Sequence, residues 1–108
     1  MLSSYRIMWI FVMFDLPVVE KIERKAATDF RNNLLDNGFE MAQFSVYMRF
    51  CSSSAQVETL TRKVEAYLPV GGKVSVLQFT DKQYERIISF KGKNKSPKNK
   101  SPDQYELF

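Results

Sequence analysis

The sequence offers few side chains that can do chemistry. It contains no His and a single cysteine, Cys51. The absence of His excludes imidazole metal sites and Ser-His or Cys-His nucleophilic pairs. With no base to activate it, Cys51 is expected to be a small buried apolar side chain, and a lone cysteine excludes an intrachain disulfide framework. Carboxylate, Lys, Arg, hydroxyl and metal-ion chemistry remain.

Asp15 is the carboxylate in the most suggestive place, directly after the apolar run Ile7–Phe14 and two residues before Pro17. An Asp here can be a turn-former that accepts backbone N–H bonds. Alternatively, two copies related by a twofold axis can share one hard cation. At about 5 Å and an effective dielectric near 20, their repulsion costs roughly 3 kcal/mol, which bound Mg²⁺ would relieve. The ion would also lower the pKa of its water and so create a nucleophile.

Side chains near this acid in sequence are candidate contacts to the phosphates of a nucleic acid. Gln43 and Ser45, at a predicted strand break, can hydrogen-bond a phosphate or simply form the turn. Each basic candidate has the alternative of being an ordinary solvated charge. Three lie off the apolar stripe of the first predicted helix and one follows on a predicted strand: Arg24, Lys25, Arg31 and Arg49.

Hydrophobic periodicity predicts the elements that position these residues. The first elements are a central strand over 6–14 and an amphipathic helix over 20–37, followed by two strands or one bent strand over 39–51 with a break near 43–45. A second helix then begins at the capping box Ser53-x-x-Gln56 and is closed by Pro69 and Gly71-Gly72. The last elements are a strand over 73–80, a helical turn that begins at the capping box Thr80-x-x-Gln83, and a short strand over 87–90. On the first helix the predicted buried stripe is Ile22, Ala26, Phe30 and Leu34. This order predicts an α+β, ferredoxin-like β-α-β-β-α-β fold with an extra C-terminal strand.

The sheet carries more apolar surface than two short helices can cover, so the face opposite the helices needs another cover. It includes Trp9, Phe11, Met13 and the aromatic strand 44–50. Because an exposed apolar sheet is an aggregation hazard, we expect two chains to associate through this face. The sequence therefore predicts a twofold homodimer.

The 108 residues are enough for one domain, which we place at 1–90, followed by an arm at 91–108. Residues 91–100 contain five lysines and no acidic residue, whereas the 90 residues before them carry 11 basic and 10 acidic side chains. The lysine-rich arm is either a solvated linker or a flexible contact to phosphates. The apolar end, Tyr105–Phe108, is expected to dock on a strand, subunit or partner.

The apolar run near the start does not predict a membrane segment. It is eight residues long, whereas a spanning helix needs about 20 apolar residues. No small-residue cleavage site follows it, as a secretory signal requires. We therefore expect a cytoplasmic protein, in agreement with its single cysteine.

Several short motifs, in this order and spacing, resemble the small CRISPR-associated endonuclease family, the ferredoxin-like partners of the CRISPR integrase in spacer acquisition. The resemblance covers residues 5–90. The Thr80-Asp81-Lys82-Gln83-Tyr84 segment is similar to the branch found in systems with a single large effector nuclease. The motifs are Phe14-Asp15-Leu16-Pro17, Arg24-Lys25, Asn37-Gly38-Phe39 and Gln43-x-Ser45-Val46-Tyr47.

The resemblance implies a homodimer whose terminal strands pair with the neighbouring subunit's sheet. It implies that Asp15 is the catalytic and metal-binding position, with Mg²⁺ held between two subunits, and that RNA or DNA is cleaved. In spacer acquisition, a step of antiviral defence, it implies that the dimer bridges the integrase and holds prespacer duplex DNA. Family members often have Tyr before the Asp, whereas this chain has Phe14, which removes a hydroxyl.

We interpret the chain as a CRISPR adaptation protein that binds duplex DNA, with Mg²⁺-dependent endonuclease activity at Asp15. Three alternatives stay open. The first is a non-catalytic nucleic-acid-binding scaffold in which Asp15 is structural. The second is a ferredoxin-like small-molecule-sensing regulatory domain, whose ligand loop would be Gly71-Gly72, although these glycines more simply form a helix-to-strand turn. The third is a related toxin-like RNA-cleaving family of the same fold.

Overall fold

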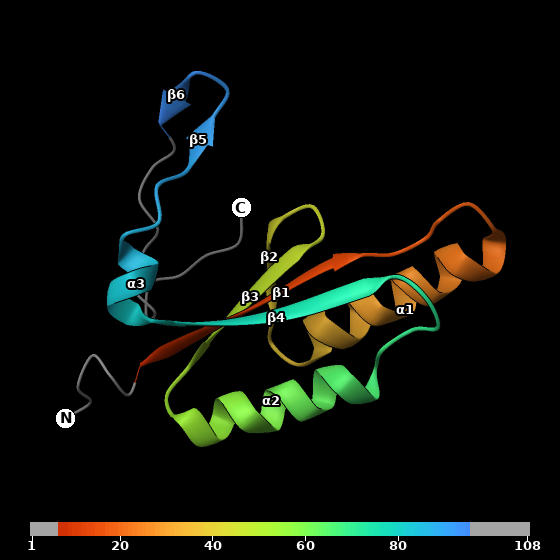
Figure 1. Cartoon of the computed structure of the whole chain (residues 1–108), viewed down its shortest axis with the longest axis horizontal. Helices are drawn as coiled ribbons and strands as arrows, with labels where there is room; N and C mark the ends of the chain where they lie inside the picture. Colours follow the sequence, from red (N-terminus) through yellow and green to blue (C-terminus); the bar gives the residue numbers. More distant parts are fainter. Residues whose placement is uncertain (1–6, 96–108) are drawn as a thin grey trace.

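The computed structural model describes residues 7–95; the Tyr105–Phe108 segment and the lysines beyond residue 95 lie outside them. In chain order the described elements are β1 Met8–Asp15, α1 Lys21–Asp36, β2 Glu40–Gln43, β3 Val46–Cys51, α2 Ser54–Ala66, β4 Lys73–Thr80, α3 Asp81–Glu85, β5 Phe90–Lys91 and β6 Asn94–Lys95 (Figure 1). The predicted region 39–51 is thus two strands, joined by a turn at residues 44 and 45.

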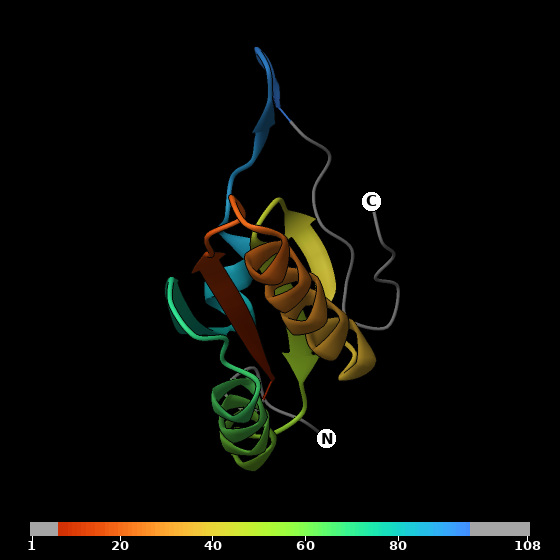
Figure 2. The ribbon, with the colours of Figure 1, turned by 90° about the vertical axis from the view of Figure 1, so that its right-hand side faces the viewer.

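The four long strands form one antiparallel sheet in the order β2-β3-β1-β4. Helices α1 and α2 both pack on one face of it (Figures 1 and 2). This is the ferredoxin-like arrangement that the order of elements predicted. None of the described helices is long and apolar enough to cross a membrane.

The main core lies between the helices and the sheet. Successive side chains of a strand point to opposite faces, so Ile10 and Val12 of β1 meet the helices. The buried helix residues are Phe30 and Leu34 of α1 and Val57, Leu60 and Val64 of α2. The prediction that Ile22 belongs to this stripe is wrong, since it is 73% exposed. The first turn of α1 extends past the end of the sheet, where none of the described strands covers it (Figure 1).

A second core lies on the opposite face of the sheet, under α3. The Trp9 ring stacks on the Tyr84 ring with centroids 3.8 Å apart, and its indole N–H donates to Asp81 Oδ1 at 2.9 Å. Thr80 and Gln83 make the predicted capping box that begins α3. Trp9 is therefore covered within its own chain. The apolar surface left for a second copy is smaller than predicted and includes Met13, which is 44% exposed.

The chain after α3 differs from the predicted strand at 87–90. Residues 87–89 are irregular, and β5 pairs with β6 in a separate two-stranded hairpin that projects from the body (Figure 1). The turn between them contains Gly92 at a φ of 65°, a conformation that glycine adopts without strain. Strands β5 and β6 therefore pair with each other and not with the four-stranded sheet.

Glu40 of β2 stands beside this second core, directly across from Met48 of β3. Its Oε2 atom is buried and has no hydrogen-bond partner among the described residues. Burial raises the pKa of the Glu40 carboxyl. Burial also raises the pKa of Tyr84 to about 12, with further contributions from the charges of Asp81 and Glu40. The ionised form of the Glu40 carboxyl is thus disfavoured by its burial in the folded protein.

Replacement of Glu40 by Gln should stabilise the protein at neutral pH. A carboxyl with a raised folded-state pKa binds its proton more tightly when folded, so its ionised form lowers stability above that pKa. The melting temperature of Glu40→Gln should exceed the parent's at pH 7, and the difference should vanish below about pH 4, where the unfolded carboxyl is also protonated. Glu58→Gln is the control, because Glu58 belongs to an exposed ion pair with Arg62. A parent more stable than Glu40→Gln at pH 7 would contradict this account.

Candidate metal-binding and nucleic-acid-binding site

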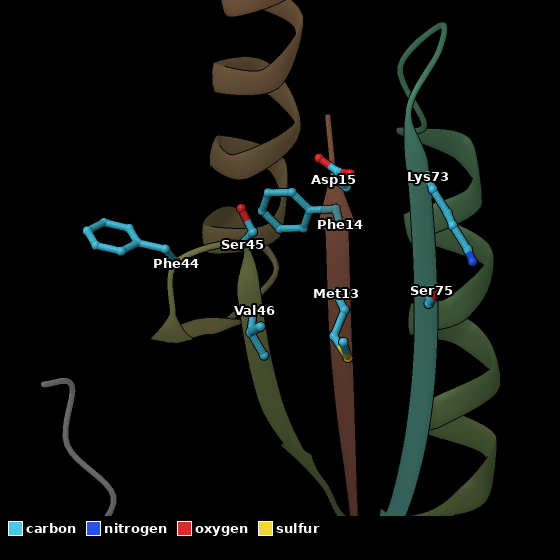
Figure 3. Close-up of a pocket in the computed structure, with 8 residues that line it drawn as sticks. All are labelled: Met13, Phe14, Asp15, Phe44, Ser45, Val46, Lys73 and Ser75. Atoms are coloured by element: carbon cyan, nitrogen blue, oxygen red, sulfur yellow. The ribbon is translucent and has the colours of Figure 1, made fainter. Parts of the chain in front are cut away.

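Asp15 is the last residue of β1, and it is exposed. Strand register places it directly across from Lys73, the first residue of β4. Both residues line a hollow of about 370 Å³ at the end of the sheet, which we call the Asp15 hollow (Figure 3). Its full lining is Met13, Phe14, Asp15, Phe44, Ser45, Val46, Lys73 and Ser75.

The turn between α2 and β4 determines how closely the chain can pass Asp15. Gly72 adopts a φ of +79°, and a Cβ built there would lie 2.7 Å from the Asp15 carbonyl oxygen. The same Cβ would lie 2.8 Å from a methyl carbon of Leu16. Gly71 also has a positive φ, but the nearest atom to its Cβ would be Pro17 Cγ at 4.0 Å. Gly71-Gly72 is therefore the tight helix-to-strand turn, and Gly72 leaves room for the backbone of Asp15.

Lys73 is a site residue that sequence reasoning missed. The sequence separates it from Asp15 by 58 positions, and only the β1–β4 register brings the two together. The ion pairs found among residues 7–95 are Lys25–Asp29 and Arg62–Glu58, so Lys73 is not paired with Asp15. Figure 3 shows its side chain directed away from Asp15. The ammonium group is thus available to an anion at the edge of the hollow.

The turn between β2 and β3 forms another wall of the hollow. Ser45 has a φ of 63°, which is rare for a residue with a side chain. Its carbonyl oxygen accepts a hydrogen bond of 3.0 Å from the Phe14 N–H, so the turn is attached to β1 next to Asp15. The Phe14 ring packs edge-on against Phe30 and stacks on Tyr47, with centroids 5.2 and 5.7 Å away. Phe14 therefore anchors the end of β1 to the core.

A groove of about 510 Å³ lies on the other side of this turn, between α1 and the β2–β3 turn. Arg24 and Arg31 of α1 both line it, together with Tyr47 and Ser45. Burial raises the pKa of the Tyr47 hydroxyl, and the positive charge of nearby Arg31 opposes that rise. The groove, here the arginine groove, is therefore an electropositive depression adjoining the Asp15 hollow.

Three of the basic residues predicted to contact phosphates make contacts within the protein. The Arg24 guanidinium donates to the Val19 carbonyl at 2.6 Å, which attaches the β1–α1 loop to the helix. Lys25 pairs with Asp29 at 2.9 Å and lines neither depression. Arg49 donates to the Asn37 carbonyl at 2.7 Å, so it satisfies the C-terminal end of α1. Gln43 ends β2 and is exposed.

The structure therefore brings some of the candidates together and leaves others apart. Asp15 and Ser45 share the Asp15 hollow, and Ser45 also lines the arginine groove with Arg24 and Arg31. Lys25 and Arg49 lie outside both depressions. No motif singled out Lys73, because only strand pairing across a long sequence separation places it there.

The described residues of one chain do not make a complete ligand set for a metal ion. Among residues 7–95 there is no group of three or more Asp, Glu, Cys or His side chains that could hold a metal ion. Among the described residues that line the hollow, Asp15 is the only acidic one, and the hydroxyl groups of Ser45 and Ser75 are the other side-chain oxygens. Hard cations such as Mg²⁺ take six oxygen ligands, often with several waters and one or two carboxylates. The described residues of one chain therefore offer a single carboxylate and two hydroxyl groups, fewer ligands than such an ion takes.

Fold and site together define a small ferredoxin-like protein with an exposed carboxylate at a strand end, beside an arginine-lined groove. Residues 8–87 match the family model described as CRISPR associated protein Cas2. The chain belongs to this family.

Relatives named CRISPR-associated endoribonuclease Cas2 resemble the chain over nearly its full length. The one from Paracidovorax avenae is 67% identical over 108 residues and covers all of both chains. The one from Flavobacterium psychrophilum is 47% identical over 107 residues, which are 99% of this chain and 93% of that relative. A third, from Parvibaculum lavamentivorans, is 43% identical over 101 residues, 94% of this chain and all of that relative.

Alanine at Gly72 should destabilise the protein more than alanine at Gly71. Both changes force a side chain into the left-handed region, at about 1–2 kcal/mol each. Gly72→Ala also pushes a methyl group against the Asp15 carbonyl and Leu16, whereas the methyl group of Gly71→Ala makes an ordinary contact with Pro17 Cγ at 4.0 Å. Urea denaturation should show a free energy of unfolding lower for Gly72→Ala than for Gly71→Ala by at least about 1 kcal/mol. Equal losses would mean that the close approach to Asp15 is unimportant.

Proposed function

We propose that the protein acts in CRISPR adaptation as a twofold homodimer that binds nucleic acid through its phosphates and cleaves phosphodiester bonds with Mg²⁺. The observation that carries this proposal is the exposed, solitary Asp15 carboxylate, which shares its hollow with an unpaired lysine, Lys73. The relatives' name, endoribonuclease, supports RNA as the cleaved substrate. The proposal includes binding of prespacer duplex DNA and docking on the CRISPR integrase.

Dimerisation supplies what one chain lacks. Two Asp15 carboxylates that approach each other repel, and a divalent cation between them removes that repulsion. Residual apolar exposure at this end of the sheet, on Met13, favours contact with a second copy there. The magnesium ion, when bound, supplies an activated water and charge neutralisation at the phosphate.

The chain's own residues bind and orient the phosphodiester backbone. Lys73 lies across the register from Asp15 and can neutralise a phosphate oxygen at the edge of the hollow. Arg31 lines the neighbouring groove and offers a planar donor fork to the next phosphates. The net charge of +4 and the exposed lysines 91 and 93 of the hairpin region add general attraction to a polyanion.

A second candidate is a non-catalytic scaffold that holds nucleic acid without cleaving it. The composition of the hollow favours it, because Asp15 is its only acidic side chain and the sequence contains no His. Hydrolysis would therefore depend entirely on a metal-activated water. The same Asp15 variant separates the two candidates.

Asp15→Asn should abolish cleavage without unfolding the protein, since Asp15 is exposed and the amide has nearly the same shape. With Mg²⁺ and labelled RNA, we expect the cleavage rate to fall by at least about 100-fold. Removal of the metal with EDTA should have the same effect on the parent. Binding of duplex DNA should be kept, because a negative charge is lost.

Asp29→Asn is the matched control, since Asp29 is exposed on α1 and lines neither depression. It should cleave as the parent does. Cleavage retained in Asp15→Asn would assign the activity to a contaminant. A parent that binds duplex DNA but never cleaves would establish the scaffold.

Arg31→Ala should weaken binding of duplex DNA more than Lys25→Ala. Arg31 lines the arginine groove, whereas Lys25 is paired with Asp29. Loss of one phosphate contact should reduce the slope of log K against log salt by about 0.9 for Arg31→Ala. The measurement is fluorescence anisotropy over a series of salt concentrations. Equal slopes for Arg31→Ala and the parent would remove the groove from the interface.

A further inference from the structure

Phe44 is the aromatic side chain that the fold leaves most exposed among residues 7–95. It is 91% exposed at the tip of the β2–β3 turn, and Figure 3 shows its ring pointing away from the sheet. An aromatic ring in water is unfavourable unless a partner covers it. A polar residue would serve equally well to make a turn at this place, so turn formation does not account for the ring.

The tip that carries Phe44 is held firmly. Ser45 keeps its left-handed conformation, with a φ of 63°, and its carbonyl accepts the Phe14 N–H at 3.0 Å. Gln43 and Val46 pair across the base of the turn. The ring is therefore presented from a fixed backbone, which limits the entropy lost when a ligand binds.

The place of Phe44 between two charged depressions indicates what covers it. Phe44 lines both the Asp15 hollow, with Lys73, and the arginine groove, with Arg24 and Arg31. The exposed ring therefore borders two depressions whose linings include cationic side chains. A single-stranded nucleic acid has the complementary pattern, because each base has an apolar face and is flanked by phosphates.

We propose that Phe44 is a stacking platform for an unpaired base, and that it makes the site prefer single-stranded RNA or DNA, or an unpaired end, over the interior of a duplex. Bases inside a duplex are already stacked on each other and offer Phe44 no free face. Stacking on an aromatic ring tolerates every base, so the contact selects strandedness rather than sequence. This inference rests on the proposed function and adds a specificity-determining residue to it.

The test compares binding of single-stranded and duplex oligonucleotides by the full chain, in EDTA so that no cleavage occurs. Phe44→Ala should bind oligo-U RNA and oligo-dT DNA at least about fivefold more weakly than the parent, while duplex affinity changes less than about twofold. The two oligonucleotides show whether the sugar matters. Val70→Ala is the control, since Val70 is a fully exposed apolar residue that lines neither depression.

Two further variants distinguish stacking from simple apolar contact. Phe44→Trp should keep or strengthen single-strand binding, and its indole fluorescence should fall as the oligonucleotide is added, against the constant signal of buried Trp9. Phe44→Leu keeps apolar surface without a π-face, and its affinity should resemble that of Phe44→Ala. Full rescue by Phe44→Leu would overturn the stacking assignment.

The outcomes separate this inference from the function on which it rests. If the parent binds neither single strands nor duplexes, the proposed function fails. If the parent binds them and Phe44→Ala leaves single-strand affinity unchanged, or weakens both forms equally, only the stacking inference fails. A second copy of the chain could cover Phe44 in place of a base, and light scattering of the same samples tests this. Dissociation of a dimer on Phe44→Ala would assign the ring to the contact between copies.

Discussion

The two-sided burial of β1 is the constraint on which the rest of the structure depends. Its side chains alternate between two cores, with Ile10 and Val12 under the helices and Trp9 under α3. A shift of one residue in register would exchange these sets, so that each would meet the core built for the other. The same alternation carries Asp15 past the covered region, to the face opposite the helices. The candidate site therefore exists because a strongly specified strand ends in an acid beyond its own core.

The basic residues near this strand end differ in whether they make contacts within the described part of the chain. Lys73 lies across the register from Asp15 without pairing, and Arg31 lines the adjacent groove. In contrast, Arg24 donates a hydrogen bond to a loop carbonyl, and Lys25 forms an ion pair with a neighbouring acid. Arg49 donates a hydrogen bond to the C-terminal end of α1. Basic residues that seem equivalent in sequence thus divide into those that maintain the fold and those available to an anion.

The proposed Mg²⁺ site requires a second copy of the chain, because Asp15 is the only acidic side chain among the described residues that line its hollow. A solitary carboxylate is a poor ligand set, and symmetry is the simplest way to double it. Helix α3 limits where that symmetry can act, because it covers Trp9 and Met48 within the chain. The apolar residues that stay exposed at the Asp15 end, Met13 and Phe44, border the hollow itself.

Local chemistry was sufficient to predict most of the elements, although not the hairpin of β5 and β6. The apolar run of β1, the four-residue spacing of α1, the caps at Ser53 and Thr80, and Asp15 at a strand end all act over a few residues. Tertiary structure alone decided what depends on distant contacts. Strand register places Lys73 across from Asp15, and Arg49 donates a hydrogen bond to the C-terminal end of α1. Ile22 is exposed because the first turn of α1 lies past the end of the sheet, and α3 packs on Trp9. Periodicity reports which side of an element is apolar, whereas the partner it meets is determined by packing of the whole chain.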